Sequence, residues 1–205
     1  MGRTRQISNL LFVALLASAC LPKTTPTAAT TVPAPLPSLA EKYHSLDTQT
    51  TVEEVNNILT AINIKDQQKI TDLFSYTTVA CRTVNGMGGP PPCREGEAEG
   101  KLVKVLPILG PEGTYLWKDE VSNWQGLDVV GLYAVYEVSE SAYSDENFSK
   151  GNYGIILVGE VNDLNVVLQV TDAGIVRIDY PTALDEILER DAERVILAPK
   201  ALKSK

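Results

Sequence analysis

The spacing of apolar residues predicts two consecutive amphipathic helices shortly after residue 50. Thr51 and Glu54 have the spacing of a capping box, which indicates the start of the first helix. Asp66 has the character of an N-cap for the second helix, which we expect to end near Tyr76. Apolar residues recur at steps of three and four and therefore share one face of each helix. They are Val52, Val55, Ile58, Leu59 and Ile62 in the first helix, and Ile70, Leu73 and Phe74 in the second.

From residue 101 the period changes to two and β-branched residues dominate, which predicts strands. The run 127–138 is apolar on both faces, as expected of a strand in the middle of a sheet. The separators 162–163 and 171–174 suit hairpin turns, so the last three strands are antiparallel neighbours. In chain order the predicted strands are 101–109, 114–121, 127–138, 153–161, 164–170 and 175–180.

A final helix is predicted after Pro181, with Thr182 and Asp185 as its capping pair. We expect it to continue far enough to include Val195 and Ile196 on its apolar side. Two opening helices packed on a curved antiparallel sheet of about six strands, plus a C-terminal helix, define the class as α+β.

Arg177 and Asp179 alternate with apolar residues in the last predicted strand. Residues two apart in a strand point to the same side of the sheet, so the two side chains are expected to meet. We interpret them as an exposed ion pair on the outer side of the sheet.

The first nineteen residues have the layout of a bacterial signal peptide. Arg3 and Arg5 precede a short apolar run, Leu10–Ala19, which falls well below the roughly 20 residues that a membrane-spanning helix needs. The following Cys20 ends a Leu-Ala-Ser-Ala-Cys sequence that resembles the bacterial lipobox, although Ala17 stands where leucine is most common. The resemblance implies a lipid on Cys20 that holds the chain at a membrane of the cell envelope. An ordinary signal peptide with an incidental cysteine is the alternative.

Residues 20–40 are rich in Pro, Thr and Ala and have the composition of an extended tether, and residues 41–205 have the length of a single domain. Removal of Arg3 and Arg5 leaves 16 of 18 basic residues against 26 acidic ones, a formal charge of −10. Nucleic acid is therefore excluded as an expected partner, since it requires a basic patch.

Cys81 and Cys93 remain once Cys20 is assigned to the lipid. Outside the reducing cytosol we expect them to form a disulfide that closes a Gly- and Pro-rich loop. Two thiols without a neighbouring histidine or further cysteine cannot complete a tetrahedral zinc shell, so no metal site is expected there.

Two segments carry a resemblance to the NTF2-like α+β roll, a relative of the cystatin-like fold. They are IKDQQKITDLF at 64–74 and VTDAGIVRIDYP at 170–181, and the resemblance extends over about residues 52–181. The block GGPPPCREGEAEGKLVKVLP at 88–107 resembles segments of an uncharacterised family of bacterial extracytoplasmic proteins. The disulfide loop and the final helix depart from the NTF2-like pattern, and a cystatin-like or an unrelated sheet-and-helix fold is the alternative.

The resemblance implies either a non-enzymatic domain that binds a protein or a small apolar ligand, or an enzyme of the isomerase, dehydratase or hydrolase type. The chain has a single histidine, His44, beside the tether, and it lacks a nucleophile elbow and a phosphate-binding loop. We therefore predict a binding domain with no catalytic residues and no cofactor. Aromatic residues in the sheet region are the predicted ligand or partner contacts, with Trp124 exposed at a hairpin tip. They are Trp117, Trp124, Tyr133 and Tyr153.

Overall fold

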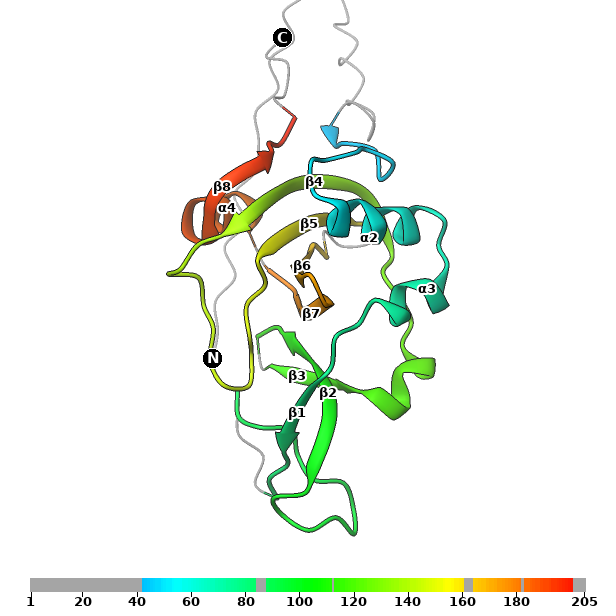
Figure 1. Cartoon of the computed structure of the whole chain (residues 1–205), viewed down its shortest axis with the longest axis vertical. Coiled ribbons are helices and arrows are strands. Elements are labelled where there is room, and N and C mark those ends of the chain that lie inside the picture. The colour runs from blue at the N-terminus through cyan, green and yellow to red at the C-terminus, as the bar shows by residue number, and fades with distance from the viewer. Residues whose placement is uncertain (1–41, 84–87, 112, 161–163, 182, 201–205) are drawn as a thin grey trace, which may run out of the picture. The chain divides into compact units, whose positions relative to one another are not determined.

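The computed structural model describes residues 42–83, 88–111, 113–160, 164–181 and 183–200 (Figure 1). The predicted signal peptide, the tether and Cys20 lie outside these residues. The main element is a mixed sheet of eight strands. Its strands are β1 (Thr77–Ala80), β2 (Leu102–Leu109), β3 (Thr114–Trp117), β4 (Val129–Val138), β5 (Tyr153–Gly159), β6 (Val166–Thr171), β7 (Gly174–Asp179) and β8 (Ala192–Leu197).

The predicted fold class, two helices on an NTF2-like antiparallel sheet of six strands, is wrong. The strand order is β1-β2-β7-β6-β5-β4-β8, with β3 paired to β2. Strands β2 and β7 run parallel where Ile108 and Leu109 pair with Ile178 and Asp179, whereas the remaining strand pairs are antiparallel. The described chain is thus mostly a large mixed sheet with a few short helices.

The helices agree with the sequence in part. The helix α2 (Glu53–Asn63) forms where predicted, but its N-cap is Val52 and no capping box forms. The side chain of Asp66 caps α3 (Gln67–Asp72) by accepting from the Lys69 N–H, as predicted, although α3 ends four residues before Tyr76. The helix α4 (Leu184–Asp191) is shorter than predicted, and a 3-10 helix, η1 (Lys118–Asn123), follows β3.

The predicted extension of the last helix through Val195 and Ile196 is wrong, because both residues belong to β8. Strand β8 pairs antiparallel with β4, for example Val195 with Tyr136 and Arg194 with Glu137. Thr182 of the predicted capping pair lies outside the described residues, and the N-cap of α4 is Ala183, whose side chain makes no capping hydrogen bond. Pairing with the free edge of β4 gives this segment hydrogen-bond partners that its own sequence pattern does not reveal.

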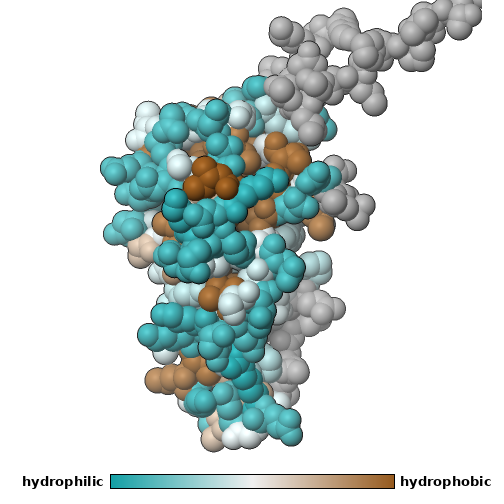
Figure 2. Space-filling view, turned by 90° about the vertical axis from the view of Figure 1, so that its right-hand side faces the viewer, coloured by the Kyte–Doolittle hydropathy of each residue, from teal (hydrophilic) through white to brown (hydrophobic). Residues whose placement is uncertain are grey.

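The two faces of the central strands differ in character. On one face Leu157, Leu168 and Ile178 belong to a large apolar cluster that includes the buried side of α2 and α3. On the other face Ala134, Tyr136, Ile156 and Val167 form a smaller cluster with Ile187 of α4. The outer surface on the side of α2 and α3 is mainly hydrophilic, with scattered hydrophobic groups (Figure 2). Scattered groups of this kind need no partner to explain them.

The predicted disulfide is confirmed: Cys81 and Cys93 are bonded, with their Cα atoms 4.9 Å apart. Cys81 is fully buried in a third apolar cluster with Val103 and Val105 of β2. The backbone N–H of Cys81 donates to Lys101 O at 2.9 Å, which attaches the cysteine to the start of β2. The disulfide therefore stabilises the end of the sheet made by β1, β2 and β3.

The start of the described chain lies beside β4 and meets the segment that follows β8 (Figure 1). His44 and Leu132 exchange two backbone hydrogen bonds of 2.9 Å, and the His44 Nε2 atom donates to Ala198 O at 2.8 Å. None of the helices in the described ranges is long and apolar enough to cross a membrane.

Candidate functional site

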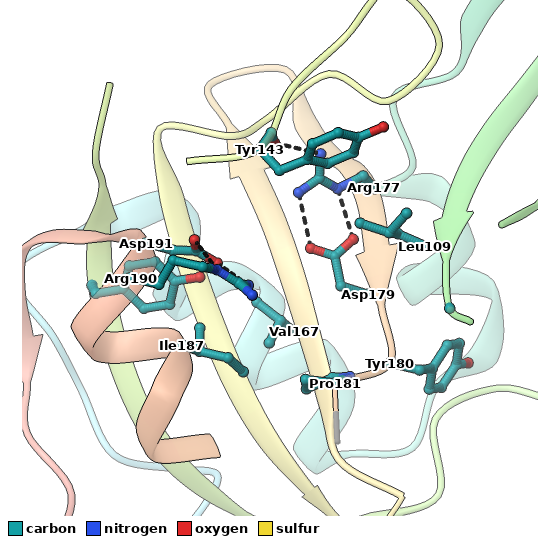
Figure 3. A pocket seen from close by; sticks show the side chains of 12 residues that line it. Leu109, Tyr143, Val167, Arg177, Asp179, Tyr180, Pro181, Ile187, Arg190 and Asp191 are labelled. Atoms are coloured by element: carbon teal, nitrogen blue, oxygen red, sulfur yellow. Dashed lines mark hydrogen bonds and ion pairs between the residues drawn. The ribbon is translucent and has the colours of Figure 1, made fainter. Parts of the chain in front are cut away.

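A recess of about 120 Å³ lies on the α4 side of the sheet (Figure 3). Tyr136 of β4, Arg177 and Asp179 of β7, and Arg190 and Asp191 of α4 line it together with apolar residues. Because side chains alternate along a strand, Tyr136, Arg177 and Asp179 point away from the large apolar cluster and toward α4. We call this recess the α4 cavity.

The Arg177–Asp179 pair is buried, so its prediction as an exposed ion pair on the outer side is wrong. The side chains are only 3% and 15% exposed. The Arg177 Nε and Nη2 atoms donate to the two Asp179 oxygens at 2.7 and 3.0 Å. The pair is covered because Arg177 Nη1 also donates to the carbonyls of Tyr143 and Phe148, at 3.1 and 2.8 Å, in the segment that joins β4 to β5.

A second ion pair closes the other side of the α4 cavity. The Arg190 Nε and Nη2 atoms each donate to an Asp191 oxygen at 2.7 Å. Asp191 is 10% exposed, whereas Arg190 is 68% exposed, so the guanidinium remains in contact with solvent. Hydrogen bonding to Asp191 raises the pKa of Arg190, which therefore stays charged.

Tyr136 contributes a buried hydroxyl that has no hydrogen-bond partner within the described parts of the chain. The side chain is fully buried, and it faces Gly154, its partner in the β4–β5 register. A Cβ atom on residue 154 would overlap the Tyr136 ring, so glycine is needed for this close approach. The nearby Gln169 amide donates one of its two Nε2 hydrogens to Asp179 at 3.2 Å, and its Oε1 accepts from the Gly151 N–H at 3.0 Å, so the only acceptor of this side chain already serves a backbone donor.

Burial sets the protonation of these groups. Removal from water raises the pKa of Tyr136, and the charges of Asp191 and Asp179 raise it further, so the phenol is a neutral donor. Burial also raises the pKa of Asp179, and this effect exceeds the lowering by the charge and hydrogen bonds of Arg177. The α4 cavity therefore combines the neutral Tyr136 hydroxyl with two carboxyl groups that each accept hydrogen bonds from a guanidinium.

The residues predicted to contact a ligand do not meet at one site. Trp117, at the end of β3, lies under the Arg94 guanidinium, 3.9 Å from the ring centroid, in a separate groove. The Tyr133 hydroxyl donates to Asp185 of α4. Tyr153 packs against the large apolar cluster.

The prediction that Trp124 is exposed at a hairpin tip is wrong. Trp124 follows η1 and is half-buried. Its ring contacts Phe74 edge to face, with 5.0 Å between ring centroids. It is therefore part of the packing beside α3 and is not a free contact residue.

The sequence interpretation missed Tyr136, Arg190 and Asp191 as site residues. An available signal was Gly154 within an otherwise apolar strand, because glycine in a strand often marks the close approach of another group. No group of three or more His, Cys, Asp or Glu residues in the described ranges could hold a metal ion.

Comparisons with protein-family models, with curated proteins and with solved structures found no match. The class of this protein is therefore stated by its own architecture, an eight-stranded mixed sheet with a polar cavity under a short helix.

Proposed function

We propose that this chain is a lipid-anchored protein of the bacterial cell envelope whose folded domain binds a small molecule without transforming it. The observation that carries the binding role is the Tyr136 hydroxyl, which is buried beside the α4 cavity without a partner. An unsatisfied buried hydroxyl costs about 1–3 kcal/mol, and a bound ligand is a means of satisfying it.

Support for the envelope location comes from two cysteine features. The Cys81–Cys93 disulfide suits an oxidising compartment. The lipobox-like sequence before Cys20 supports attachment through a diacylglyceryl group.

Binding without chemistry is favoured because both carboxylates of the α4 cavity are already paired. Asp179 accepts from Arg177 and Gln169, and Asp191 accepts from Arg190. A general base needs a carboxylate that can reach the proton of a substrate. The sole histidine, His44, donates to Ala198 and does not line the cavity.

Acid–base catalysis in the same cavity is the second candidate, and the pKa of Asp179 favours it. A buried carboxyl with a raised pKa in a recess is a recurrent feature of active sites. In that role Asp179 would exchange a proton with the substrate while Tyr136 donates a hydrogen bond.

The two candidates are separated by isolating the tagged protein from the envelope and exposing it to a small-molecule extract of the same cells. If the protein only binds its ligand, the compounds that denaturation releases from it should have the same masses as compounds already present in the extract. New masses that require Asp179, and that disappear with Asp179→Asn, would establish the enzyme instead.

The anchor has an independent test. Cys20→Ala is expected to move the protein from the membrane fraction to the soluble fraction, and the wild-type N-terminus should carry the mass of a diacylglyceryl group. Membrane retention of Cys20→Ala would refute lipid attachment at this residue.

A further inference from the structure

The hydrogen-bonding groups left over in the α4 cavity are donors. Each carboxylate of Asp179 and Asp191 accepts two hydrogen bonds from a guanidinium. The Tyr136 hydroxyl has no partner, and the Arg190 Nη1 atom makes no hydrogen bond to any described residue. The guanidinium can only donate and the hydroxyl can donate its proton, so a ligand that supplies acceptors satisfies both groups, and the guanidinium favours acceptors that carry negative charge.

The size and walls of the cavity limit the rest of the ligand. A volume of about 120 Å³ is well below that of a site for a drug-sized molecule. At roughly 30 Å³ for each water-sized group, it accommodates about four non-hydrogen atoms. Leu109, Val167 and Ile187 add apolar side chains to the lining (Figure 3). These walls suit a short aliphatic chain.

We propose that the α4 cavity binds a short-chain monocarboxylic acid, with the carboxylate between the Tyr136 hydroxyl and the Arg190 guanidinium and the alkyl group against the apolar wall. This inference rests on the proposed binding function and names its ligand class. Arg190 is the solvent-facing part of the site, because its side chain is 68% exposed. The Tyr136 oxygen is closed off from water, so a ligand contacts it only by displacing a neighbouring side chain of the lining.

The direct test is calorimetric titration of the full chain carrying Cys20→Ala with sodium propionate. This protein lacks the proposed lipid site, so the result does not depend on whether the anchor exists. We expect saturable binding at one site. Propionamide has a similar shape and no charge, and it is expected to bind at least tenfold more weakly, since hydrogen bonds to charged groups are the stronger ones.

Tyr136→Phe removes the unpartnered hydroxyl and keeps the ring. Loss of a hydrogen bond to a charged acceptor is expected to weaken propionate binding about ten- to a hundredfold. Tyr133→Phe is the matched control, because Tyr133 lies on the same strand and its hydroxyl donates to Asp185 outside the cavity lining. Its affinity should equal that of the parent chain.

Arg190→Gln provides a second variant at a largely exposed position and should weaken propionate binding by a similar factor. Failure of propionate to bind saturably would overturn the inference. Equal binding of propionamide would show that the site does not select a carboxylate. Unchanged affinity for propionate in both Tyr136→Phe and Arg190→Gln would show that the ligand does not bind in the α4 cavity. None of these results would bear on lipid attachment at Cys20.

Discussion

The two faces of the central sheet are built from alternate residues of the same strands, yet they are stabilised differently. Toward α2 and α3, residues such as Leu157 and Leu168 form a continuous apolar core. Toward α4, the neighbouring residues Gln169, Arg177 and Asp179 form a buried polar network beside a cavity. The first face derives its stability from the area removed from water, whereas the second depends on each charge keeping its partner.

This difference indicates where the molecule tolerates change. A close-packed apolar face loses stability in proportion to the volume removed. A polar face can lose more from a single substitution, because the remaining charge is left buried and unpaired. It also keeps an empty volume that a ligand can use, which the packed face does not.

The largest effect is expected for Arg177→Met. This change leaves the Asp179 carboxylate buried without its guanidinium and should lower the free energy of unfolding by about 3–5 kcal/mol in urea denaturation. Because burial keeps the pKa of Asp179 above its ordinary value, the folded state binds a proton more readily than the unfolded state. Part of the loss should therefore return as the pH falls through that pKa.

Two further variants test whether the loss of stability comes from the unpaired charge. Arg177→Met with Asp179→Leu should recover most of the stability, since no buried charge remains. Arg194→Met is the matched control. The Arg194 side chain is 68% exposed, so loss of its ion pair with Glu137 should change the free energy of unfolding only slightly. A single variant as stable as the wild type would show that the pair is not buried in solution.

The apolar face is tested by Leu168→Ala. Leu168 is fully buried in the large cluster, so truncation should cost about 2–5 kcal/mol in the same measurement. Val167→Ala, one residue away on the other face, should cost less, because Val167 already borders the α4 cavity. A greater loss for Val167→Ala would reverse the assignment of packed and hollow faces.

Gly154→Ala tests the close approach that places Tyr136. The new methyl group would overlap the phenol ring, and overpacking of this kind costs about 1–3 kcal/mol. Gly110→Ala is the control, because a Cβ atom there would meet nothing within 4 Å. Thermal unfolding of both variants makes the comparison, and equal melting temperatures would contradict the described packing.

The smallest effect concerns Tyr133, whose pKa is raised to about 12 by partial burial and by its hydrogen bond to Asp185. The folded state thus favours the neutral phenol, and this contribution to stability is complete below pH 10. It should be lost as the pH rises from about 10 to about 12. Tyr133→Phe should show a shallower decline over that range in denaturation curves, and parallel declines would exclude the contribution.

Much of the local structure could be predicted from the sequence because it depends on neighbouring residues. The apolar period of α2, the cap at Asp66 and the disulfide all follow from short-range patterns. The antiparallel run β5, β6 and β7 follows from two short turns. These features are independent of how the sheet is completed.

The rest depends on contacts between distant segments. The alternation of Arg177 and Asp179 indicates that they share a face, but the covering carbonyls of Tyr143 and Phe148 are about 30 residues away in the chain. Residues 192–197 fit a helical pattern and become β8 only because β4 offers a free edge. The α4 cavity depends on contacts of this kind between distant segments. The spacing of apolar residues therefore could not indicate which residues line it.

The pairing of His44 with Leu132 determines how the domain would bear mechanical load. A pull on the chain preceding residue 42 acts first on two backbone hydrogen bonds of 2.9 Å at the edge of β4. These bonds can break one after the other while the remaining strands stay together. A domain pulled at this point would yield by peeling a short terminal segment, and the interior of the sheet would stay intact.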